Sequence, residues 1–205
     1  MELNQVFDNV YCINLDHRKD RWEQCNTHFT KHGITVDRFP AINGKEVVPN
    51  GVGKLLPGEV GVIRSNYNVV KDAKDNNYKQ IVIFEDDVEL DPEFKEKFFS
   101  FYSAVPDNWS FIYMGGNHVG GIIPVNNKVA QIRHSYAIHA ICIKNNLFDH
   151  ILELLKKEKT QVDVTYAQLQ AVFPSYVFIP HLAWQKDGFS DIQGGYMNYD
   201  FLRRY

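Results

Sequence analysis

Three adjacent carboxylates, Glu85, Asp86 and Asp87, directly follow an apolar run that begins at Ile81. The four β-favouring residues before them predict a strand buried on both faces. Acids at the end of such a strand repel one another, and partial burial disfavours their charged forms. A divalent cation would relieve both effects, because hard cations prefer oxygen ligands. The junction therefore predicts a metal site at the carboxyl end of a buried strand, where open α/β sheets bind ligands.

A structural explanation of the same acids is a strand followed by a helix-capping residue. Asp91-Pro92-Glu93 fits that explanation, since an N-cap aspartate is commonly followed by proline at the first helical position. Asp91 meets the capping requirement by itself, however, so the three acids before it remain to be explained. The metal interpretation is therefore preferred, with Asp91 expected as the N-cap of the next helix.

The length and the composition of the chain predict one ordinary globular domain that spans residues 1–205. A hydrophobic content of 44% is enough for a core that needs no disulfide or metal. The net charge of −3 argues against a nucleic-acid partner, because such proteins usually carry a basic excess. Cys12, Cys25 and Cys142 are scattered and form no zinc-binding spacing, which favours a reducing compartment.

The N-terminus and the hydropathy pattern give no targeting signal. Residues 1–5 lack the basic and apolar regions of a signal peptide. No apolar stretch approaches the roughly 18 residues of a membrane span. These features lead us to expect a cytoplasmic protein without a transmembrane segment.

Strands and helices are expected to alternate along the first half of the chain. We expect strands at 10–15, 34–39, 81–84, 110–114, 136–143 and 176–179, and helices at 18–32, 60–73, 94–102 and 147–156. Residues 43–58 are rich in turn formers, and the glycine-rich stretch 115–128 is expected to be a loop that closes over a ligand or an ordinary long hairpin. The alternation predicts an α/β fold with a mostly parallel central sheet flanked by helices.

Eight short motifs occur in one order across residues 10–192. They are Ile13-Asn14-Leu15 with Arg18 and Arg21; Ala41-Ile42-Asn43-Gly44; Pro57-Gly58-Glu59-Val60-Gly61; Glu85-Asp86-Asp87; the run from Trp109 to Gly115; Tyr136-Ala137; Val162-Asp163; and Pro180 through Gln185 to Ser190-Asp191-Ile192. Together they resemble the motifs of glycosyltransferase family 25, which includes bacterial lipooligosaccharide galactosyltransferases and the domains that galactosylate collagen hydroxylysine. Two positions depart from the family pattern: Val62 stands where a cysteine is frequent, and Ser65-Asn66 replaces Ser-His.

The resemblance implies a GT-A fold, which is a Rossmann-like domain that binds a nucleotide-sugar. It further implies an inverting transfer, in which an acceptor hydroxyl displaces a nucleoside diphosphate from the anomeric carbon. The donor would be a UDP-sugar carrying galactose or glucose, and the acceptor a hydroxyl of a glycan or of a hydroxylysine-type protein site.

A divalent cation, Mn²⁺ or Mg²⁺, would bridge the leaving diphosphate to protein carboxylates. By analogy with GT-A enzymes, Asp87 would bind it directly, while Glu85 or Asp86 would hold ribose or water ligands; Glu85 and Asp191 are the further candidate metal ligands. The acceptor hydroxyl also needs a general base. Asp163 is the first candidate for that base and Asp191 the second, although Asp163 could simply cap a helix and Asp191 could be a turn residue.

Polar residues after the first strand are the candidates for binding the nucleotide. They are Asn14, Asp16, Arg18 and Arg21. Arginine can also bind a diphosphate through two nitrogens, although on this helix both could face solvent. Gln185 and Ser190 are expected near the donor sugar or its phosphates. His181 is either a metal ligand or a structural histidine, and Glu59 either contacts substrate or favours a helix N-terminus.

Two other classes of function remain. A degenerate relative could bind a nucleotide-sugar or a protein partner without turnover; the intact Glu85-Asp86-Asp87 motif argues against this, and Asn66 argues for it. A phosphate-ester hydrolase would usually need additional His or Asp ligands around two metals, and the sequence offers no such cluster.

Overall fold

The computed structural model describes residues 3–50 and 54–203, so the expected turn-rich segment 43–58 lies partly outside the described residues. The α-helices are α1 (Leu3–Val6), α2 (Lys19–Lys31), α3 (Pro57–Asp75), α4 (Phe94–Tyr102), α5 (Phe148–Leu155) and α6 (Val162–Gln170). The strands are β1 (Asn9–Asn14), β2 (Asp37–Pro40), β3 (Gln80–Glu85), β4 (Val88–Leu90), β5 (Phe111–Tyr113), β6 (Ile122–Pro124), β7 (Val129–Ile132), β8 (Ala140–Lys144), β9 (Ser175–Phe178), β10 (Ala183–Gln185), β11 (Gly188–Ser190) and β12 (Gly195–Met197). Short 3-10 turns cover Gly44–Glu46, Asn145–Leu147 and Asp200–Arg203.

The central sheet has the strand order β2-β1-β3-β8-β5-β9-β7-β6. Strands β2, β1, β3, β5, β9 and β6 point one way, and β8 and β7 are reversed. The sheet is therefore mixed, with most described strands running in a common direction, and the predicted α/β class is confirmed. Two small antiparallel pairs, β4 with β10 and β11 with β12, lie beside it.

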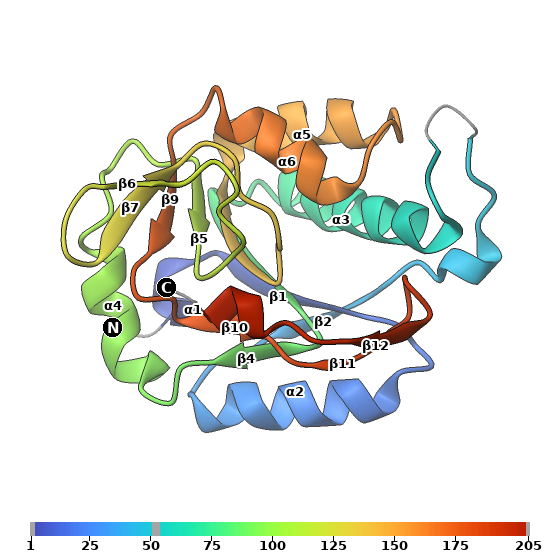
Figure 1. Cartoon of the computed structure of the whole chain (residues 1–205), viewed down its shortest axis with the longest axis horizontal. Coiled ribbons are helices and arrows are strands. Elements are labelled where there is room, and N and C mark those ends of the chain that lie inside the picture. The colour runs from blue at the N-terminus through green and yellow to red at the C-terminus, as the bar shows by residue number, and fades with distance from the viewer. Residues whose placement is uncertain (1–2, 51–53, 204–205) are drawn as a thin grey trace.

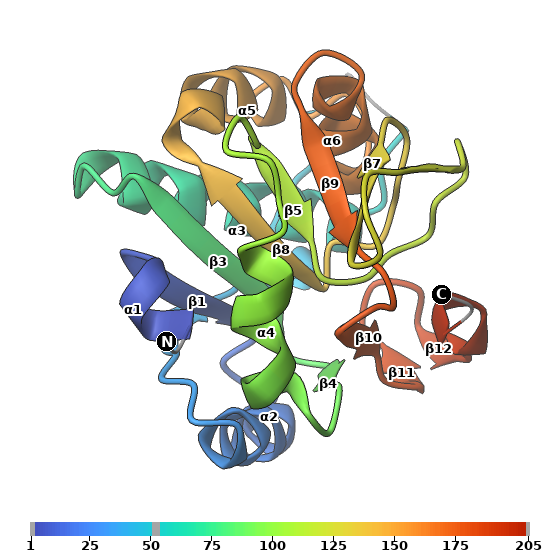
Figure 2. The same ribbon diagram turned by 90° about the vertical axis from the view of Figure 1, so that its left-hand side faces the viewer.

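Helices cover both faces of this sheet, as expected (Figures 1 and 2). Along β3, Ile81 and Ile83 point toward the layer of α3, α5 and α6, whereas Val82 and Phe84 point toward α2 and α4. All four side chains are buried. A strand between two helical layers must be apolar on both sides, which explains the continuous apolar run before Glu85.

The chain changes direction across the sheet between β1 and β3. From β1 it passes through α2 to β2 on one side, and it later returns through α3 to β3 on the other side of β1. In open α/β sheets, such a switch point leaves a crevice beyond the carboxyl ends of the two strands. Here those ends carry Asn14 and Glu85.

Most of the expected helices and strands are confirmed, and the short strands were missed. The stretch 115–128 holds β6, which pairs with β7 as an antiparallel hairpin. The expected strand at 136–143 begins only at Ala140, because Ala137 adopts a left-handed backbone with φ of 65°. Strands of three residues, such as β10 to β12, are too short to show a clear alternation of polar and apolar residues.

One capping expectation was wrong. Asp91 accepts a hydrogen bond from the Glu93 backbone N–H at 2.8 Å, but helix α4 begins later and Glu93 itself is the N-cap residue. Asp91 instead stabilises the turn before the helix and binds Lys97 Nζ at 3.0 Å. It still serves a purely structural purpose, so it leaves the three preceding acids unexplained as before.

No helix among the described residues combines the length and the apolar character that crossing a membrane requires.

Candidate functional site

The acidic turn, defined here as Glu85, Asp86 and Asp87, joins β3 to β4 at the crevice. Asp86 is fully engaged by neighbouring elements. Asn14 Nδ2 donates to its Oδ2 at 2.7 Å, and Arg21 Nη1 donates to its Oδ1 at 2.9 Å. The end of β1 and the first turns of α2 therefore meet at this carboxylate, as the parallel arrangement of β1 and β3 predicts.

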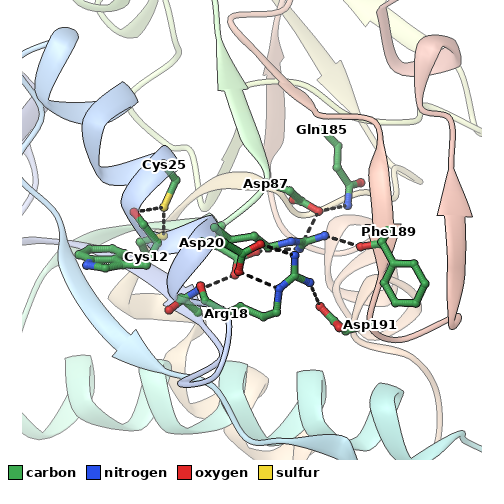
Figure 3. Close-up of polar contacts among 12 residues, drawn as sticks. Cys12, Arg18, Asp20, Cys25, Asp87, Gln185, Phe189 and Asp191 are labelled. Atoms are coloured by element: carbon green, nitrogen blue, oxygen red, sulfur yellow. Dashed lines mark hydrogen bonds and ion pairs between the residues drawn. The ribbon is translucent and has the colours of Figure 1, made fainter.

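Asp87 has the same charge as Asp86 but a different environment. Its Oδ2 accepts a hydrogen bond from Gln185 Nε2 at 3.2 Å and lies 3.5 Å from Arg21 Nη1 (Figure 3). Its Oδ1 is buried and accepts no hydrogen bond from any described residue. Burial raises the pKa of Asp87 to about 6; Arg21 opposes this shift and Asp86 adds to it. Asp87 is thus a partly buried carboxylate with one buried oxygen left for a further partner.

Glu85 and Asp163 complete a group of acids at the centre of the crevice. Burial raises the pKa of Glu85 well above its usual range, and the charges of Asp87 and Asp163 raise it further. Asp163 therefore lies close enough to the acidic turn to interact with it. Burial also raises the pKa of Asp163, while a hydrogen bond from the Ala137 N–H opposes the shift. Burial thus makes the charged forms of these three acids less favourable than in water, and a nearby cation would offset this effect.

Helix α6 presents Asp163 to the crevice, and the residue does not cap that helix. Gln161 is the N-cap residue, and Asp163 lies in the first helical turn. Its Oδ2 accepts a hydrogen bond at 2.9 Å from the backbone N–H of Ala137. A left-handed conformation is unusual for alanine and is found mainly where the surroundings enforce it. The carboxylate is thereby fixed in position between α6 and the turn before β8.

Residues 186–201 form a segment, here called the strap, that crosses the acidic turn. It contains the β11–β12 hairpin, and none of its side chains is buried, whereas Ala183 before it and Leu202 after it are. The Lys186 N–H donates to the Asp87 carbonyl at 2.8 Å, and Arg21 Nη2 donates to the Phe189 carbonyl at 2.5 Å. The strap is therefore held over the acids mainly by polar contacts.

The strap places Asp191 and Ser190 differently from the sequence expectation. Asp191 forms an ion pair with Arg18, which also binds Asp20 at 3.0 Å (Figure 3). Ser190 Oγ accepts a hydrogen bond from the Gln193 N–H at 3.2 Å within its own turn. No group of three His, Cys, Asp or Glu side chains suited to a metal ion exists in the described part of the chain. Asp191 is thus paired with Arg18 here, and its expected role as a metal ligand with Asp87 and Glu85 stays a prediction.

The candidate nucleotide-binding residues after β1 divide into two kinds. Asn14 is buried, and its Oδ1 accepts a hydrogen bond from Arg38 Nε at 2.8 Å. Asp16 is exposed and forms an ion pair with Arg38 Nη2 at 2.6 Å. Asn14 and Arg21 thus belong to the buried network around Asp86, while Asp16 lies at its solvent-facing edge. Arg38, on β2, was missed by the sequence analysis because nothing near it in the sequence links it to Asn14.

Two residues with open assignments have structural partners. Glu59 Oε2 accepts a hydrogen bond from the Leu56 N–H at 2.8 Å and so caps α3. His181 is buried, with Nε2 2.8 Å from His118 Nε2 and Nδ1 3.0 Å from the Leu202 carbonyl. The histidine pair joins the end of β9 to the last described turn, which makes His181 an anchor for the strap.

Asn66, which replaces the histidine of the family pattern, is also satisfied internally. Its Nδ2 donates to the Val62 carbonyl at 3.0 Å, and its Oδ1 accepts a hydrogen bond from the Tyr166 hydroxyl at 3.3 Å. The substitution therefore links α3 to α6 without reaching the acidic turn.

Tyr199 is a further site residue that sequence reasoning missed. Burial raises the pKa of its hydroxyl, and the charges of Asp87 and Glu85 raise it further. The phenol therefore lies near the acids, although 112 residues separate Tyr199 from Asp87. No local motif marks it, because the strap brings it there only through its tertiary position.

The residues of the acidic turn fit a hard divalent cation. Asp87 Oδ1 is a buried acceptor without a partner among the described residues, and Glu85 lies beside it with its charge disfavoured by Asp87 and Asp163. A cation such as Mg²⁺ is commonly held by one or two carboxylates, with substrate phosphates and water completing its coordination. A third preformed protein ligand is therefore not required.

Sequence comparisons place the chain among sugar-transferring proteins. The family model described as "Glycosyltransferase family 25 (LPS biosynthesis protein)" matches residues 7–118. A "Glycosyltransferase 25 family member" of Anopheles gambiae is 28% identical over 129 residues, covering 52% of this chain and 21% of the relative. "Procollagen galactosyltransferase 2" of Homo sapiens is 28% identical over 129 residues, covering 53% of this chain and 21% of that protein. The chain therefore corresponds to about a fifth of the length of these relatives.

Solved structures with a similar arrangement are more distant. A crystal structure of a glycosyltransferase involved in the glycosylation of the major capsid of PBCV-1 has a TM-score of 0.44 at 9% identity, covering 72% of this chain and 64% of that one. The structure of A197 from STIV has a TM-score of 0.46 at 11% identity, covering 86% of this chain and 84% of that one.

Proposed function

The chain belongs to glycosyltransferase family 25, and we propose that it transfers a hexose, galactose or glucose, from a UDP-sugar to a hydroxyl acceptor. The observation that supports this proposal is the group of partly buried acids, Glu85, Asp87 and Asp163, near the switch point of the sheet. Carboxylates whose charged forms are disfavoured by burial are suited to hold a cation and to accept a proton.

In this proposal, Asp87 and Glu85 hold Mn²⁺ or Mg²⁺, and Asp86 fixes the turn through Asn14 and Arg21. When bound, the cation would neutralise the negative charge that develops on the leaving diphosphate. Arg18 and Arg21 line the same opening and can bind phosphate oxygens through two nitrogens. Gln185, held against Asp87 at 3.2 Å, would orient that carboxylate.

Asp163 is the proposed general base. It would take the proton from the acceptor hydroxyl while the oxygen attacks the anomeric carbon from the face opposite the leaving group, which inverts the configuration. Its raised pKa brings it nearer to neutral pH, where a general base works best. The Ala137 N–H binds Oδ2 of Asp163, so Oδ1 remains for the acceptor hydroxyl.

The acceptor in this proposal is a glycan or a hydroxylysine-type protein hydroxyl. Its support is the printed name of the human relative, a procollagen galactosyltransferase.

Thermal unfolding with UDP-, GDP- and CMP-sugars, each with and without Mn²⁺, tests the donor assignment. We expect stabilisation by a UDP-sugar that depends on the cation, because a ligand that binds only the native state raises its stability. Stabilisation by none of these donors would contradict the proposal.

Release of UDP then tests turnover. Asp163→Asn should lower the rate by about 10²–10⁴-fold and leave stabilisation by UDP with Mn²⁺ intact, since the base acts on the acceptor. Asp149→Asn is the matched control, because Asp149 is exposed and pairs with Lys74 on the surface. Donor binding without any UDP release, with water and a panel of hydroxyl acceptors, would point instead to a non-catalytic relative.

A further inference from the structure

Two cysteines that the proposed mechanism does not use lie in contact beneath the site. Cys12 is in the middle of β1, Cys25 is in α2, and their sulfur atoms are 3.9 Å apart (Figure 3). Both are buried, with exposed fractions of 0% and 4%. Cys142 is the third free thiol, on β8, two strands away from β1. Since neighbouring strands are about 4.8 Å apart, Cys142 lies outside the reach of this pair.

The thiol pair joins the same two elements as the network around Asp86. Cys12 and Asn14 are two residues apart on β1 and therefore share a face. Cys25 and Arg21 are four residues apart on α2 and therefore also share a face. Asn14 and Arg21 both bind Asp86. The position of α2 relative to β1 thus determines both the sulfur–sulfur contact and the hydrogen bonds that Asn14 and Arg21 donate to Asp86.

We propose that Cys12 and Cys25 are a reversible oxidation site whose disulfide alters the Asp86 network. Joining the sulfurs would bring them from 3.9 Å to about 2.0 Å, which requires α2 and β1 to shift or the side chains to rotate. Because Asn14 and Arg21 hold Asp86 from these two elements, any shift of α2 against β1 changes the contacts of both residues with Asp86. In a reducing compartment, disulfides are usually transient and redox-sensing, and a buried thiol pair of this kind fits that use.

The oxidant suited to these buried thiols is a small neutral peroxide, such as hydrogen peroxide. Cys25 reacts first, because Cys12 is fully buried and its pKa is raised by Cys25, by burial and by Asp86 and Asp87. The Cys25 sulfur attacks one peroxide oxygen, the O–O bond breaks, and water leaves with a sulfenic acid formed. The Cys12 sulfur then attacks Cys25, the S–O bond breaks, and a second water leaves. One peroxide is reduced as two thiols become one disulfide.

Mass spectrometry of the native protein treated with hydrogen peroxide tests the assignment. We expect a loss of about 2 Da, corresponding to two hydrogen atoms, that dithiothreitol reverses. Peptide mapping should link residue 12 to residue 25. Cys142→Ser is the matched control and should form the same bridge, whereas Cys12→Ser should stop at a sulfenic acid on Cys25. Absence of the bridge in native wild-type protein, or a bridge through Cys142, would overturn the inference without depending on any variant.

The effect on the site is measured separately. Affinity for UDP with Mn²⁺ should fall at least several-fold in the oxidised protein and recover on reduction. Equal affinity in both forms would refute the link to Asp86. This second measurement depends on the proposed function, but the mass measurement does not. If the reduced protein fails to bind UDP, the donor assignment fails while the oxidation site can still be confirmed.

Discussion

Replacing Asp87 with asparagine should make the cation-free protein more stable. The Asp87 carboxylate is partly buried, its buried Oδ1 has no hydrogen-bond partner among the described residues, and Arg21 lies 3.5 Å from its Oδ2. An uncharged amide of the same shape avoids the desolvation of the carboxylate and can still contact Gln185. Asp87 is thus expected to lower the stability of the fold, as residues needed for function often do.

The magnitude follows from the shift in pKa. Burial is the main cause that raises the pKa of Asp87 from its ordinary value of 3.8 to about 6. At about 1.4 kcal/mol per pKa unit, the ionised form costs at most ~3 kcal/mol at pH 7. This shift already contains the opposing attraction of Arg21, so the expected gain of Asp87→Asn is about 1–3 kcal/mol. For a domain of this size, each kcal/mol raises Tm by about 2–4 °C.

The sign of the pH dependence is also fixed. The folded state holds a proton on Asp87 between pH 3.8 and about 6, where the unfolded state has already released it. The contribution of Asp87 to the stability of the wild-type protein therefore falls as pH rises through that window. The advantage of Asp87→Asn should be near zero at about pH 4 and complete at pH 7.

Urea unfolding in EDTA at several pH values measures this difference, with Asp86→Asn as the matched control. Asp86 accepts hydrogen bonds from Asn14 and Arg21, so its neutralisation should destabilise the protein by about 1–3 kcal/mol. Added Mn²⁺ with UDP should stabilise the wild type and not Asp87→Asn. Equal losses of stability in the two variants would refute the reasoning.

Two further predictions concern the elements that support the site. The contribution of three buried histidines to stability should fall as pH drops from about 6.5 toward 4. Burial lowers the pKa of His118 to about 3 and of His139 and His181 to about 4, whereas histidines of the unfolded chain bind protons near 6.5. The difference in stability between the wild type and His118→Gln, measured by urea titration, should therefore shrink as pH falls. Gly115→Ala should destabilise the fold by about 3 kcal/mol or more, since its Cβ would lie 2.0 Å from the Ala183 carbonyl oxygen. A wild-type-like urea midpoint for Gly115→Ala would contradict that geometry.

Much of the layered fold could be read from the sequence. The apolar run before Glu85 predicted a doubly buried strand, and β3 has buried side chains on both faces. The helix expected at 94–102 has those bounds. Parallel strands end at one edge of the sheet, and the candidate residues Asn14 and Asp86 at the ends of two such strands do meet there. These predictions succeeded because each depends on a local period or on a general rule of sheet geometry.

The remaining elements depend on contacts between distant parts of the chain. Strand β10 has three residues and forms by pairing with β4, so its own sequence carries little signal. Asp163 looked equally suited to cap a helix, and only the backbone N–H of Ala137, 26 residues away, decides its orientation. Tyr199 reaches the acids because the strap crosses the acidic turn. Such contacts leave no periodic pattern in the sequence.

The sequence by itself determined that three acids follow one another at the end of β3. Only the tertiary structure decided that these acids have different environments. Asp86 is held by Asn14 and Arg21, whereas Asp87 keeps a buried oxygen that no described residue contacts by a hydrogen bond. Desolvation and hydrogen bonding come from neighbours on β1, α2 and β10, and these neighbours are assembled only when the chain folds.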